Sequence, residues 1–479
     1  MNSRLFKVGV LLALLGAAIP AFPQTTHLPD IGGVANAPSL EDERRMGQAV
    51  MRNLRRAGAL VDDLLATTYI NNLGYQLLSA HRQTEHEYHF FLVNDKAINA
   101  FALPGGYIGV NYGLVLASQS EDELAAVMAH EIAHVTQKHH SRAYAHQSNS
   151  QIPIIAAIIA AALIGDAQVS QAAIASSMAF QMEQQLSFTR ANEHEADRIG
   201  INVLAEAGFN PRGMADFFQR LDEQSRLYGP QAPEFLRTHP VNVNRITDAL
   251  NRAEQLQSKP RVNGSQYELM RSRLQVLSAE RPADILKTFT QKKADNQTPD
   301  AATTYGYLLA QLANQEYQAA HQTATQLKQQ GKPTLVIELA ALQAMVKVKP
   351  DRALKQYEEL LQFYPSHPAV IHDYTETLLT LGQANQARKV LNHYLKNRPE
   401  QPVFFRLLAK TESLLDNSAA SHQAMAEYYY QVGQIHQAIQ QLELALKTNT
   451  LDFYRLNQIE ARQQEFKEEL VLMTDLQNR

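Results

Sequence analysis

The chain is 479 residues long, which is enough for two or three domains that each have their own hydrophobic core. Lysine and arginine total 44 against 48 aspartate and glutamate residues, so no excess of positive charge indicates a nucleic-acid partner. The sequence contains no cysteine, which excludes disulfide bonds and a cysteine-linked lipid anchor.

The first residues have the pattern of a secretory signal peptide. Arg4 and Lys7 precede an apolar run from Val8 to Ile19, and small residues and prolines follow around Ala21. The run is shorter than the about 20 residues that a helix needs to cross a bilayer, which favours a cleaved signal over an uncleaved anchor. We therefore expect a signal peptide over residues 1–23 and a periplasmic protein that is soluble or peripherally bound to the outer membrane.

The next segment predicts a loop, two helices and a small sheet. Residues 30–39 are rich in glycine, proline and alanine and predict a surface loop. Helices are expected at 41–57 and 62–80. The stretch YHFFLVN at 88–94 predicts a strand, and 98–115 (INAFALPGGYIGVNYGLV) predicts short strands broken by its Pro-Gly-Gly turn.

A pentapeptide with two histidines and a glutamate, His130-Glu131-Ile132-Ala133-His134, has the spacing of a zinc site. Upstream, Ser120 and Glu123 predict a capping box that starts a helix. On such a helix the two histidines lie one turn apart on one face and can hold one zinc ion. Glu131 lies one step round the helix, where it can act as general base on a water at that metal. The motif predicts peptide-bond hydrolysis if a third protein ligand exists, and is accidental otherwise.

An uncharged apolar run, IPIIAAIIAAALI, occupies residues 152–164. It is too short to span a bilayer. A buried core helix is one interpretation. A lid over the active site and a segment that contacts the membrane surface are the others, and the sequence leaves all three open.

An acidic helix is expected to begin at Arg190 and to supply the third ligand. Glu193 and Asp197 are one helical turn apart on one face, so the first can bind zinc while the second accepts the N–H of a ligand histidine. Glu195 is a rival ligand that points to another face, and His194 is expected to be solvated. Alone, such an acidic helix ordinarily lies at the solvent-exposed surface, but together with the upstream HExxH motif it predicts a complete zinc site.

These motifs together resemble a known family. HExxH followed by ExxxD is the gluzincin arrangement, and the strings NAFALPGG and NEHEAD resemble the zinc peptidase family that includes the CAAX prenyl endopeptidase and its bacterial heat-shock membrane relative. The signal peptide and the repeats described below resemble the periplasmic branch of that family. The likeness covers essentially the mature chain and is strongest over 41–251. It implies one zinc ion per chain and five site residues: the ligands His130, His134 and Glu193, the base Glu131, and Asp197, which orients a ligand.

The resemblance also implies a cellular role. It suggests quality control and assembly of outer-membrane β-barrel proteins, with degradation of misfolded or stalled clients and with repeats that contact the assembly machinery. A competing class is a periplasmic chaperone or assembly scaffold in which the repeats bind clients and the zinc is structural or occluded.

His239 precedes a proline in an expected loop, where a histidine is ordinarily a surface residue. The family resemblance offers two further roles: a reversible fourth ligand that blocks the metal, or a hydrogen-bond donor to the tetrahedral oxyanion. Removing the side chain should raise proteolysis in the first case and abolish it in the second. Arg245 is a weaker oxyanion candidate and is better explained as an ion-pair partner. No acidic helix matches His139, His140 or His146, which we expect to be solvated.

The segment SKPRVNGS at 258–265 predicts a domain boundary. We therefore place a zinc metallopeptidase domain at 24–258, a helical connector at 259–300 and an all-helical domain at 301–479. The expected fold class is α+β, with a mostly helical peptidase domain that contains a small sheet, followed by a helical superhelix.

The C-terminal part of the chain contains an internal repeat. Small residues at expected helix crossings, leucines two turns later and prolines at the ends of units recur at one constant interval: Ala319, Ala353 and Ala387; Leu327, Leu361 and Leu395; and Pro365 and Pro399. A period of about 34 residues is typical of tetratricopeptide repeats, with a plain helical bundle as the alternative. The pattern returns at Ala438 and Leu446, one and a half intervals after Ala387 and Leu395, which predicts a fourth repeat after an extra unpaired helix over about 402–415.

Overall fold

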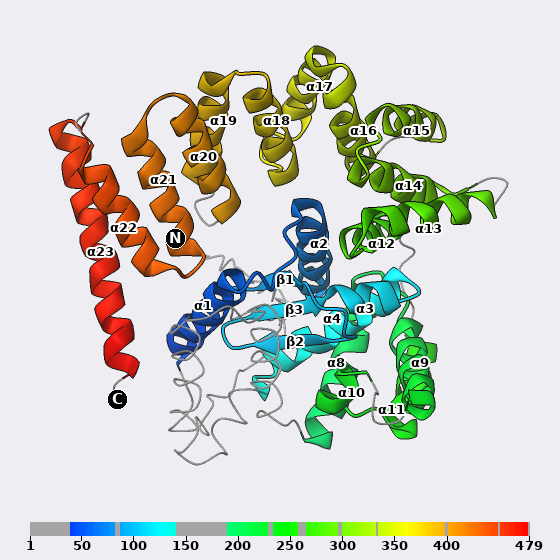
Figure 1. Ribbon diagram of the computed structural model, residues 1–479. Coiled ribbons are helices and arrows are strands. Elements are labelled where there is room, and N and C mark those ends of the chain that lie inside the picture. The colour runs from blue at the N-terminus through cyan, green and yellow to red at the C-terminus, as the bar shows by residue number, and fades with distance from the viewer. Residues whose placement is uncertain are drawn as a thin grey trace, which may run out of the picture.

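The computed structural model describes residues 39–81, 87–139, 189–228, 233–256, 265–295, 299–331, 334–397, 401–448 and 451–477. The expected signal peptide, the loop at 30–38, the apolar run at 152–164, and His140 and His146 lie outside these ranges. The described chain is a mostly helical unit with one small sheet, followed by an array of helices that curves around it (Figure 1), which confirms the predicted fold class.

The first two helices begin at side-chain caps. Helix α1 (Leu40–Arg56) starts at a capping box between Ser39 and Asp42. Helix α2 (Leu64–Ala80) starts at Asp63, whose carboxylate accepts the N–H of Ala66 at 2.8 Å. Because these caps satisfy backbone donors that the first helical turn leaves unpaired, both helices begin close to the predicted positions.

The sheet has three strands in the order β1-β3-β2. Strand β1 (His89–Val93) pairs parallel to β3 (Tyr107–Asn111), which pairs antiparallel to β2 (Ala100–Leu103). The β2–β3 turn contains Gly105 and Gly106 at φ of 78° and 80°, a conformation that residues with a side chain rarely adopt.

The prediction of strands as far as residue 115 was wrong at its end, where helix α3 (Tyr112–Ala117) follows β3 directly. Gly113 permits this switch, since a Cβ there would lie 2.1 Å from the backbone oxygen of Lys96. A short buried apolar run has the same composition in a strand and in a helix, so periodicity did not separate them.

Both faces of the sheet are covered. Alternate strand residues point to opposite faces. One set (Phe90, Leu92, Ala100, Ala102, Ile108 and Val110) joins the core beneath α2 and α4, and the other (Phe91, Val93, Phe101, Leu103 and Tyr107) packs against α1. Burial on both sides explains why these strands are apolar without alternation.

The remaining helices of the predicted peptidase domain at 24–258, called the peptidase region from here on, surround one central helix. They are α4 (Glu121–Thr136), α8 (Arg190–Glu206), α9 (Arg212–Tyr228), α10 (Phe235–Thr238) and α11 (Val243–Gln255). Helix α4 packs against α2, α8, α9 and the sheet, so its residues from Glu123 to Val135 are all buried.

The predicted capping box at the start of α4 is half formed. Ser120 accepts the N–H of Glu123, but the Glu123 carboxylate accepts the N–H of Gln119 at 2.6 Å rather than that of Ser120. The helix still begins at the predicted residue, because the serine side chain alone supplies the cap.

The expected connector consists of two helices, α12 (Ser265–Leu277) and α13 (Pro282–Ala294). Helix α12 packs against α2 and α3 on one side and against the first repeat helix on the other. At this junction the buried guanidinium of Arg273 donates to both carboxylate oxygens of Asp63, at 2.8 and 2.6 Å, and to the hydroxyl of Tyr305 at 2.9 Å. This ion pair fixes the start of the array on the peptidase region.

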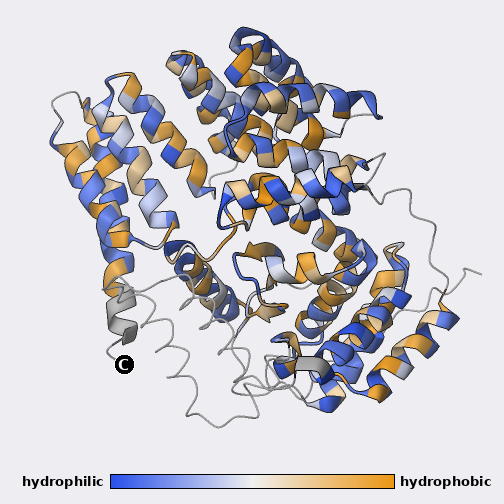
Figure 2. Cartoon of the chain, turned by 45° about the vertical axis from the view of Figure 1, so that its right-hand side comes forward, coloured by the Kyte–Doolittle hydropathy of each residue, from blue (hydrophilic) through white to orange (hydrophobic). Residues whose placement is uncertain are grey.

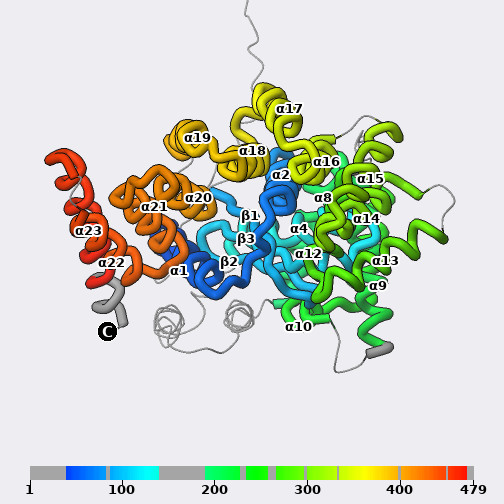
Figure 3. The backbone as a smooth tube through the Cα atoms, turned by 45° about the horizontal axis from the view of Figure 1, so that its top comes forward, coloured from blue at the N-terminus to red at the C-terminus, as the bar shows by residue number. Residues whose placement is uncertain are grey.

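The array consists of antiparallel helices that pack in sequence: α14 (Ala301–Ala313), α15 (Tyr317–Gln329), α16 (Leu335–Val348), α17 (Pro350–Phe363), α18 (Pro368–Thr380), α19 (Ala384–Asn397), α20 (Pro402–Leu414), α21 (Ser418–Gln431), α22 (Ile435–Leu446) and α23 (Phe453–Gln477). Hydrophobic and hydrophilic residues alternate along these helices (Figure 2), as expected where one face packs on neighbours. Seen with its top brought forward, the array forms a curved band around α1, α2 and the sheet (Figure 3).

Two details of the repeat prediction were wrong. The small residue buried in the first unit is Ala320, one position after the predicted Ala319, which is only half-buried. Helix α20 is not unpaired, because it packs against both α19 and α21. The fully buried alanines Ala353, Ala387 and Ala438 lie where the sequence placed them.

The far end of the array returns to the peptidase region. Arg52 on α1 forms an ion pair with Glu469 on α23 at 2.7 Å, and the hydroxyl of Tyr430 donates to the same carboxylate at 2.6 Å. A cleft of about 1010 Å³ lies between α1, β1 and the helices α20 and α21. Within the described ranges, no helix is both long and apolar enough to cross a membrane.

Candidate metal centre

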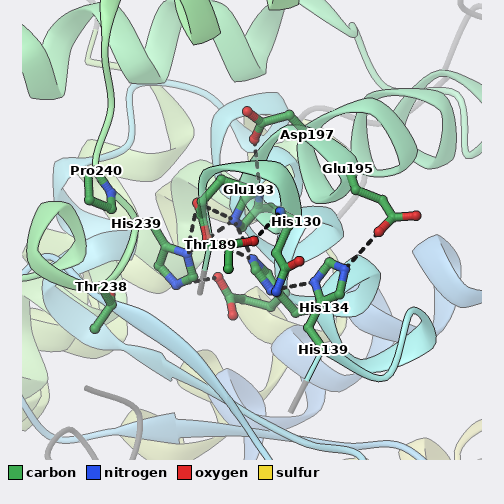
Figure 4. Close-up of polar contacts among 12 residues, drawn as sticks. His130, His134, His139, Thr189, Glu193, Glu195, Asp197, Thr238, His239 and Pro240 are labelled. Carbon is green, nitrogen blue, oxygen red and sulfur yellow. Dashed lines mark hydrogen bonds and ion pairs between the residues drawn. The ribbon is translucent and has the colours of Figure 1, made fainter. Parts of the chain in front are cut away.

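Four side chains from three separate elements meet in the buried core of the peptidase region (Figure 4). His130 and His134 come from α4, Glu193 from α8, and His239 from the residue after α10. One potential ligand atom from each lies within 4.8 Å of the others, and all four residues are buried. The structure thus brings together the three predicted zinc ligands and adds His239 to the group.

The spacing within this group fits a tetrahedral metal ion. Metal–ligand bonds of roughly 2.0–2.1 Å put the corners of a tetrahedron about 3.3 Å apart. The Nε2 of His130 lies 3.0 Å from the Nε2 of His134 and 3.5 Å from Oε2 of Glu193, while the Nε2 of His134 lies 3.4 Å from Oε1 of Glu193. The Nδ1 of His239 lies 3.3 Å from the Nε2 of His130 and 3.0 Å from Oε1 of Glu193. These separations are close to the edges of such a tetrahedron, and three imidazoles with one carboxylate are donors that suit a transition-metal ion.

Close packing of α4 on α8 places Glu193 beside the histidines. Gly200 lies where the two helices approach, and a Cβ there would be 3.1 Å from the backbone nitrogen of His130 and 3.2 Å from the carbonyl of Ala129. A larger residue would have to move one helix. The absence of a side chain at this position therefore sets the distance between the two ligand-bearing helices.

Asp197 lies behind His130, as the ExxxD pattern predicted. Its Oδ1 lies 2.9 Å from the Nδ1 of His130. Burial opposes the charge of this carboxyl, but His130 and Arg245 outweigh burial and lower the pKa of Asp197. A charged Asp197 at this ion-pair distance favours the tautomer of His130 that carries its proton on Nδ1, which leaves the Nε2 lone pair for the four-residue group.

Arg245 has the contacts of an ion-pair partner. Its Nε and Nη2 donate to the two oxygens of Asp197 at 2.6 and 2.7 Å, and its Nη1 lies 2.8 Å from Oε2 of Glu193. It also donates to the carbonyl of Pro240 at 2.9 Å. These contacts support the ion-pair interpretation over the oxyanion role. Through these contacts one buried cation holds Glu193, Asp197 and the loop that carries His239.

The four-residue group contains both charged and neutral side chains. Burial raises the pKa of Glu193, but the three histidines outweigh it and hold that pKa well below its ordinary value. Burial lowers the pKa of His134 well below its ordinary value, so this imidazole is neutral. A negative carboxylate beside a neutral imidazole is the protonation state in which both can bind a cation.

Glu131 faces the centre as a buried carboxyl. It is fully buried, and neither carboxylate oxygen has a hydrogen-bond partner among the described residues. Its nearest basic atom given by the structure is Nε2 of His239, at 3.6 Å from Oε1. Burial raises the pKa of Glu131. A buried, unsatisfied carboxyl is costly, and such groups are found mainly at functional sites.

His239 is held by its own turn of chain. Its N–H donates to the carbonyl of Phe235 at 2.8 Å, and its ring stacks on the Phe235 ring with centroids 4.8 Å apart. Its interpretation as an ordinary surface residue was wrong, since it is fully buried.

His139 was also expected to be solvated, and that expectation was wrong. It is fully buried, with Nδ1 2.9 Å from Nδ1 of His134 and Nε2 3.1 Å from Oε2 of Glu195. Glu195 therefore points away from the four-residue group, as predicted from its helical face. His194 is exposed, 3.7 Å from Asp248, and does not join the group.

The chain matches the model of peptidase family M48 over residues 65–253 and a tetratricopeptide repeat model over residues 349–411. It is 32% identical to the beta-barrel assembly-enhancing protease of Escherichia coli (strain K12) over 469 residues, which are 95% of each chain.

Two other relatives differ in coverage. The putative beta-barrel assembly-enhancing protease of Vibrio cholerae serotype O1 is 34% identical over 88% of this chain and 90% of that protein. The mitochondrial metalloendopeptidase OMA1 of Schizosaccharomyces pombe is 28% identical over 44% of this chain and 61% of that protein.

Proposed function

The chain belongs to the beta-barrel assembly-enhancing protease family, and from that premise we propose that it is a zinc-dependent endopeptidase of the periplasm that degrades misfolded or stalled outer-membrane β-barrel proteins. The location and the clients are proposed from the signal-like N-terminus and from the names of the relatives. The repeats would then bind client or assembly proteins, a task suited to the curved faces of such arrays.

The observation that supports hydrolysis is a buried carboxylate beside a tetrahedral set of ligand atoms. His130, His134 and Glu193 would hold the zinc ion, with Asp197 and Arg245 behind them. When bound, zinc supplies Lewis acidity, which polarises a peptide carbonyl and acidifies a water molecule. Zinc is favoured over magnesium or calcium because three of the four donors are imidazole nitrogens.

Glu131 would move the proton. Its unsatisfied Oε atoms can accept a proton from the attacking water and then deliver it to the nitrogen of the leaving amine, whose bond to the carbonyl carbon breaks. Its raised pKa keeps the carboxyl a better proton carrier than an exposed glutamate. The carboxylate takes and returns one proton, so it ends the cycle unchanged.

Replacing this base tests the proposal. Glu131→Gln should lower the cleavage of casein or of an unfolded β-barrel protein by about 10²–10⁴-fold. Zinc content, measured by mass spectrometry, should stay at one ion per chain. The matched control is Glu121→Gln on the same helix, which lies outside the centre and should cleave like wild type. Wild-type protein without zinc or without cleavage of any unfolded protein would refute the proposal.

We further propose that His239 is the fourth ligand of a resting state. Structural zinc sites have four protein ligands, whereas catalytic sites keep one position open. The Nδ1 of His239 is as close to His130 and Glu193 as a fourth ligand would be, at 3.3 and 3.0 Å. Cleavage would then require His239 to leave, so His239→Ala should raise the rate of proteolysis. Loss of proteolysis in this variant would instead favour the oxyanion role.

The same closed set of four donors favours a second candidate function, a chaperone or scaffold whose zinc is structural or occluded. The distinguishing measurement is the maturation of an outer-membrane client in cells that carry only the Glu131→Gln variant. Normal maturation without cleavage would support the scaffold, and arrested maturation would support the peptidase.

A further inference from the structure

The end of α4 turns back toward the metal centre. The last helical residue is Thr136, and Lys138 then adopts a φ of 53°, in the left-handed region that residues with a side chain rarely enter. The N–H of Lys138 still donates to the carbonyl of Val135 at 2.9 Å. This turn directs His139 back beneath its own helix, where its ring is fully buried next to His134.

His139 connects a predicted ligand to a carboxylate. Its Nδ1 lies 2.9 Å from the Nδ1 of His134, and its Nε2 lies 3.1 Å from Oε2 of Glu195. The other nitrogen of His134, Nε2, lies 3.0 Å from Nε2 of His130 within the four-residue group. Figure 4 shows Glu195, His139 and His134 in a row that leads from α8 to the centre.

The carboxylate sets the direction of every proton in this row. An ionised carboxylate can only accept, so Nε2 of His139 donates to Glu195. A neutral imidazole that carries its proton on Nε2 has a lone pair on Nδ1, and this lone pair accepts the Nδ1–H of His134. His134 is then left with its Nε2 lone pair facing the group. The opposite order would put an N–H of His134 there, which cannot bind a cation.

We propose that His139 and Glu195 form a positioning pair that holds His134 in its metal-binding tautomer and orientation. The proposal rests on the zinc site proposed above. Three acidic residues at alternate positions of α8 then each have one role at the site. Glu193 is a ligand, Asp197 orients His130 directly, and Glu195 orients His134 through His139. The two histidines of the HExxH motif are thus both set by the same acidic helix, one directly and one through a third histidine.

The test measures metal affinity, which does not depend on turnover. The full chain would be purified without metal, and its zinc dissociation constant would be obtained by competition with a chromogenic chelator. His139→Phe keeps an aromatic ring, slightly larger than imidazole, and removes both nitrogens, so it should weaken zinc binding by about 10–100-fold. His139→Gln keeps one acceptor and one donor and should restore affinity to within a few-fold of wild type. The absorption spectrum of bound cobalt(II) should shift in His139→Phe and return in His139→Gln.

A second variant avoids disturbing the core. Glu195 has a side chain that is one-third exposed, so Glu195→Gln should fold normally. Its amide can donate as well as accept and no longer fixes the proton direction, so zinc affinity should fall by an amount between those of the two His139 variants. The control is His194→Gln, the neighbouring exposed residue on α8, which should bind zinc like wild type.

The outcomes separate this proposal from the proposed function. If wild-type protein binds no zinc, the metal site itself is wrong and the positioning pair fails with it. If wild type binds zinc tightly and both His139→Phe and Glu195→Gln bind it equally tightly, only the positioning pair is overturned. His139→Gln binding zinc as weakly as His139→Phe would also overturn it, because the ring would then serve only to fill space.

Discussion

The metal centre and the repeat array lie in one chain but are stabilised in opposite ways. At the centre, buried charges contact one another at short distances, as between Asp197 and Arg245 at 2.6 Å. In the array, buried alanines such as Ala353, Ala387 and Ala438 let helices approach closely, and the packing is largely apolar.

This difference determines how far the effect of a substitution extends in each region. When one partner of a buried ion pair is removed, the other charge stays buried without a counter-charge. A single substitution there therefore has a large effect on stability. A repeat makes most of its contacts with its neighbours, so damage there should stay local and graded. We expect substitutions at the centre to change activity and stability together, and substitutions in the array to change stability alone.

Removing the metal should show the contrast most strongly. Chelation should abolish cleavage entirely and remove about 4 kcal/mol of stabilisation from the peptidase region if zinc was present at about 1,000 times its dissociation constant. Hydrogen exchange resolved by peptide should speed up in α4 and α8 and stay unchanged in α16 to α19. Faster exchange throughout the array would show that the two regions are one cooperative unit.

Arg245→Met should have the next largest effect. It leaves the buried carboxylates of Asp197 and Glu193 without their cation, which should lower the free energy of unfolding by about 3–5 kcal/mol. Urea denaturation followed by circular dichroism would measure this loss. The control, Arg237→Met at an exposed position, should change stability by no more than about 0.5 kcal/mol. Equal stability of both variants would mean that the ion pairs contribute nothing net.

Ala387→Leu should disturb the array without affecting the centre. The fully buried alanine lies on α19, which packs against α18 and α20, and a larger side chain should cost about 1–3 kcal/mol of stability through overpacking. Zinc content and cleavage of a short peptide should stay at wild-type values. Ala313→Leu, at an exposed position on α14, is the matched control and should be neutral. Reduced zinc content in Ala387→Leu would contradict the separation of the two regions.

Glu469→Gln should have the smallest effect. The carboxylate accepts from Arg52 and from Tyr430, and burial and this carboxylate raise the pKa of Tyr430 to about 12, so its hydroxyl stays a donor. Because the ion pair is partly exposed, its loss should cost less than about 1 kcal/mol. A double-mutant cycle with Arg52→Met, measured by urea denaturation, would give the coupling between α1 and α23. A coupling several times larger would mean that the closing contact holds the array and the peptidase region together.

Much of this protein follows from its sequence, because the relevant patterns are local. The HExxH spacing puts His130 and His134 on one face of α4, and the spacing of ExxxD does the same for Glu193 and Asp197 on α8. The small residues of the array repeat at nearly constant intervals, since each repeat makes the same crossing. These features depend on helical geometry alone, so they could be predicted without knowing which helix packs on which.

Tertiary structure decided the rest. His139 carries no local signal, because a left-handed Lys138 turns it inward, and lysine does not favour that conformation. Arg245 reaches Asp197 and Glu193 from a different helix, and α23 meets α1 from the opposite end of the chain. Such contacts depend on how helices pack in space, and packing is set by the close approach at Gly200 and by buried surface that no short stretch of sequence contains. The sequence therefore indicated which residues are candidates for the chemistry, and the packing decided which side chains lie beside them and how they are oriented.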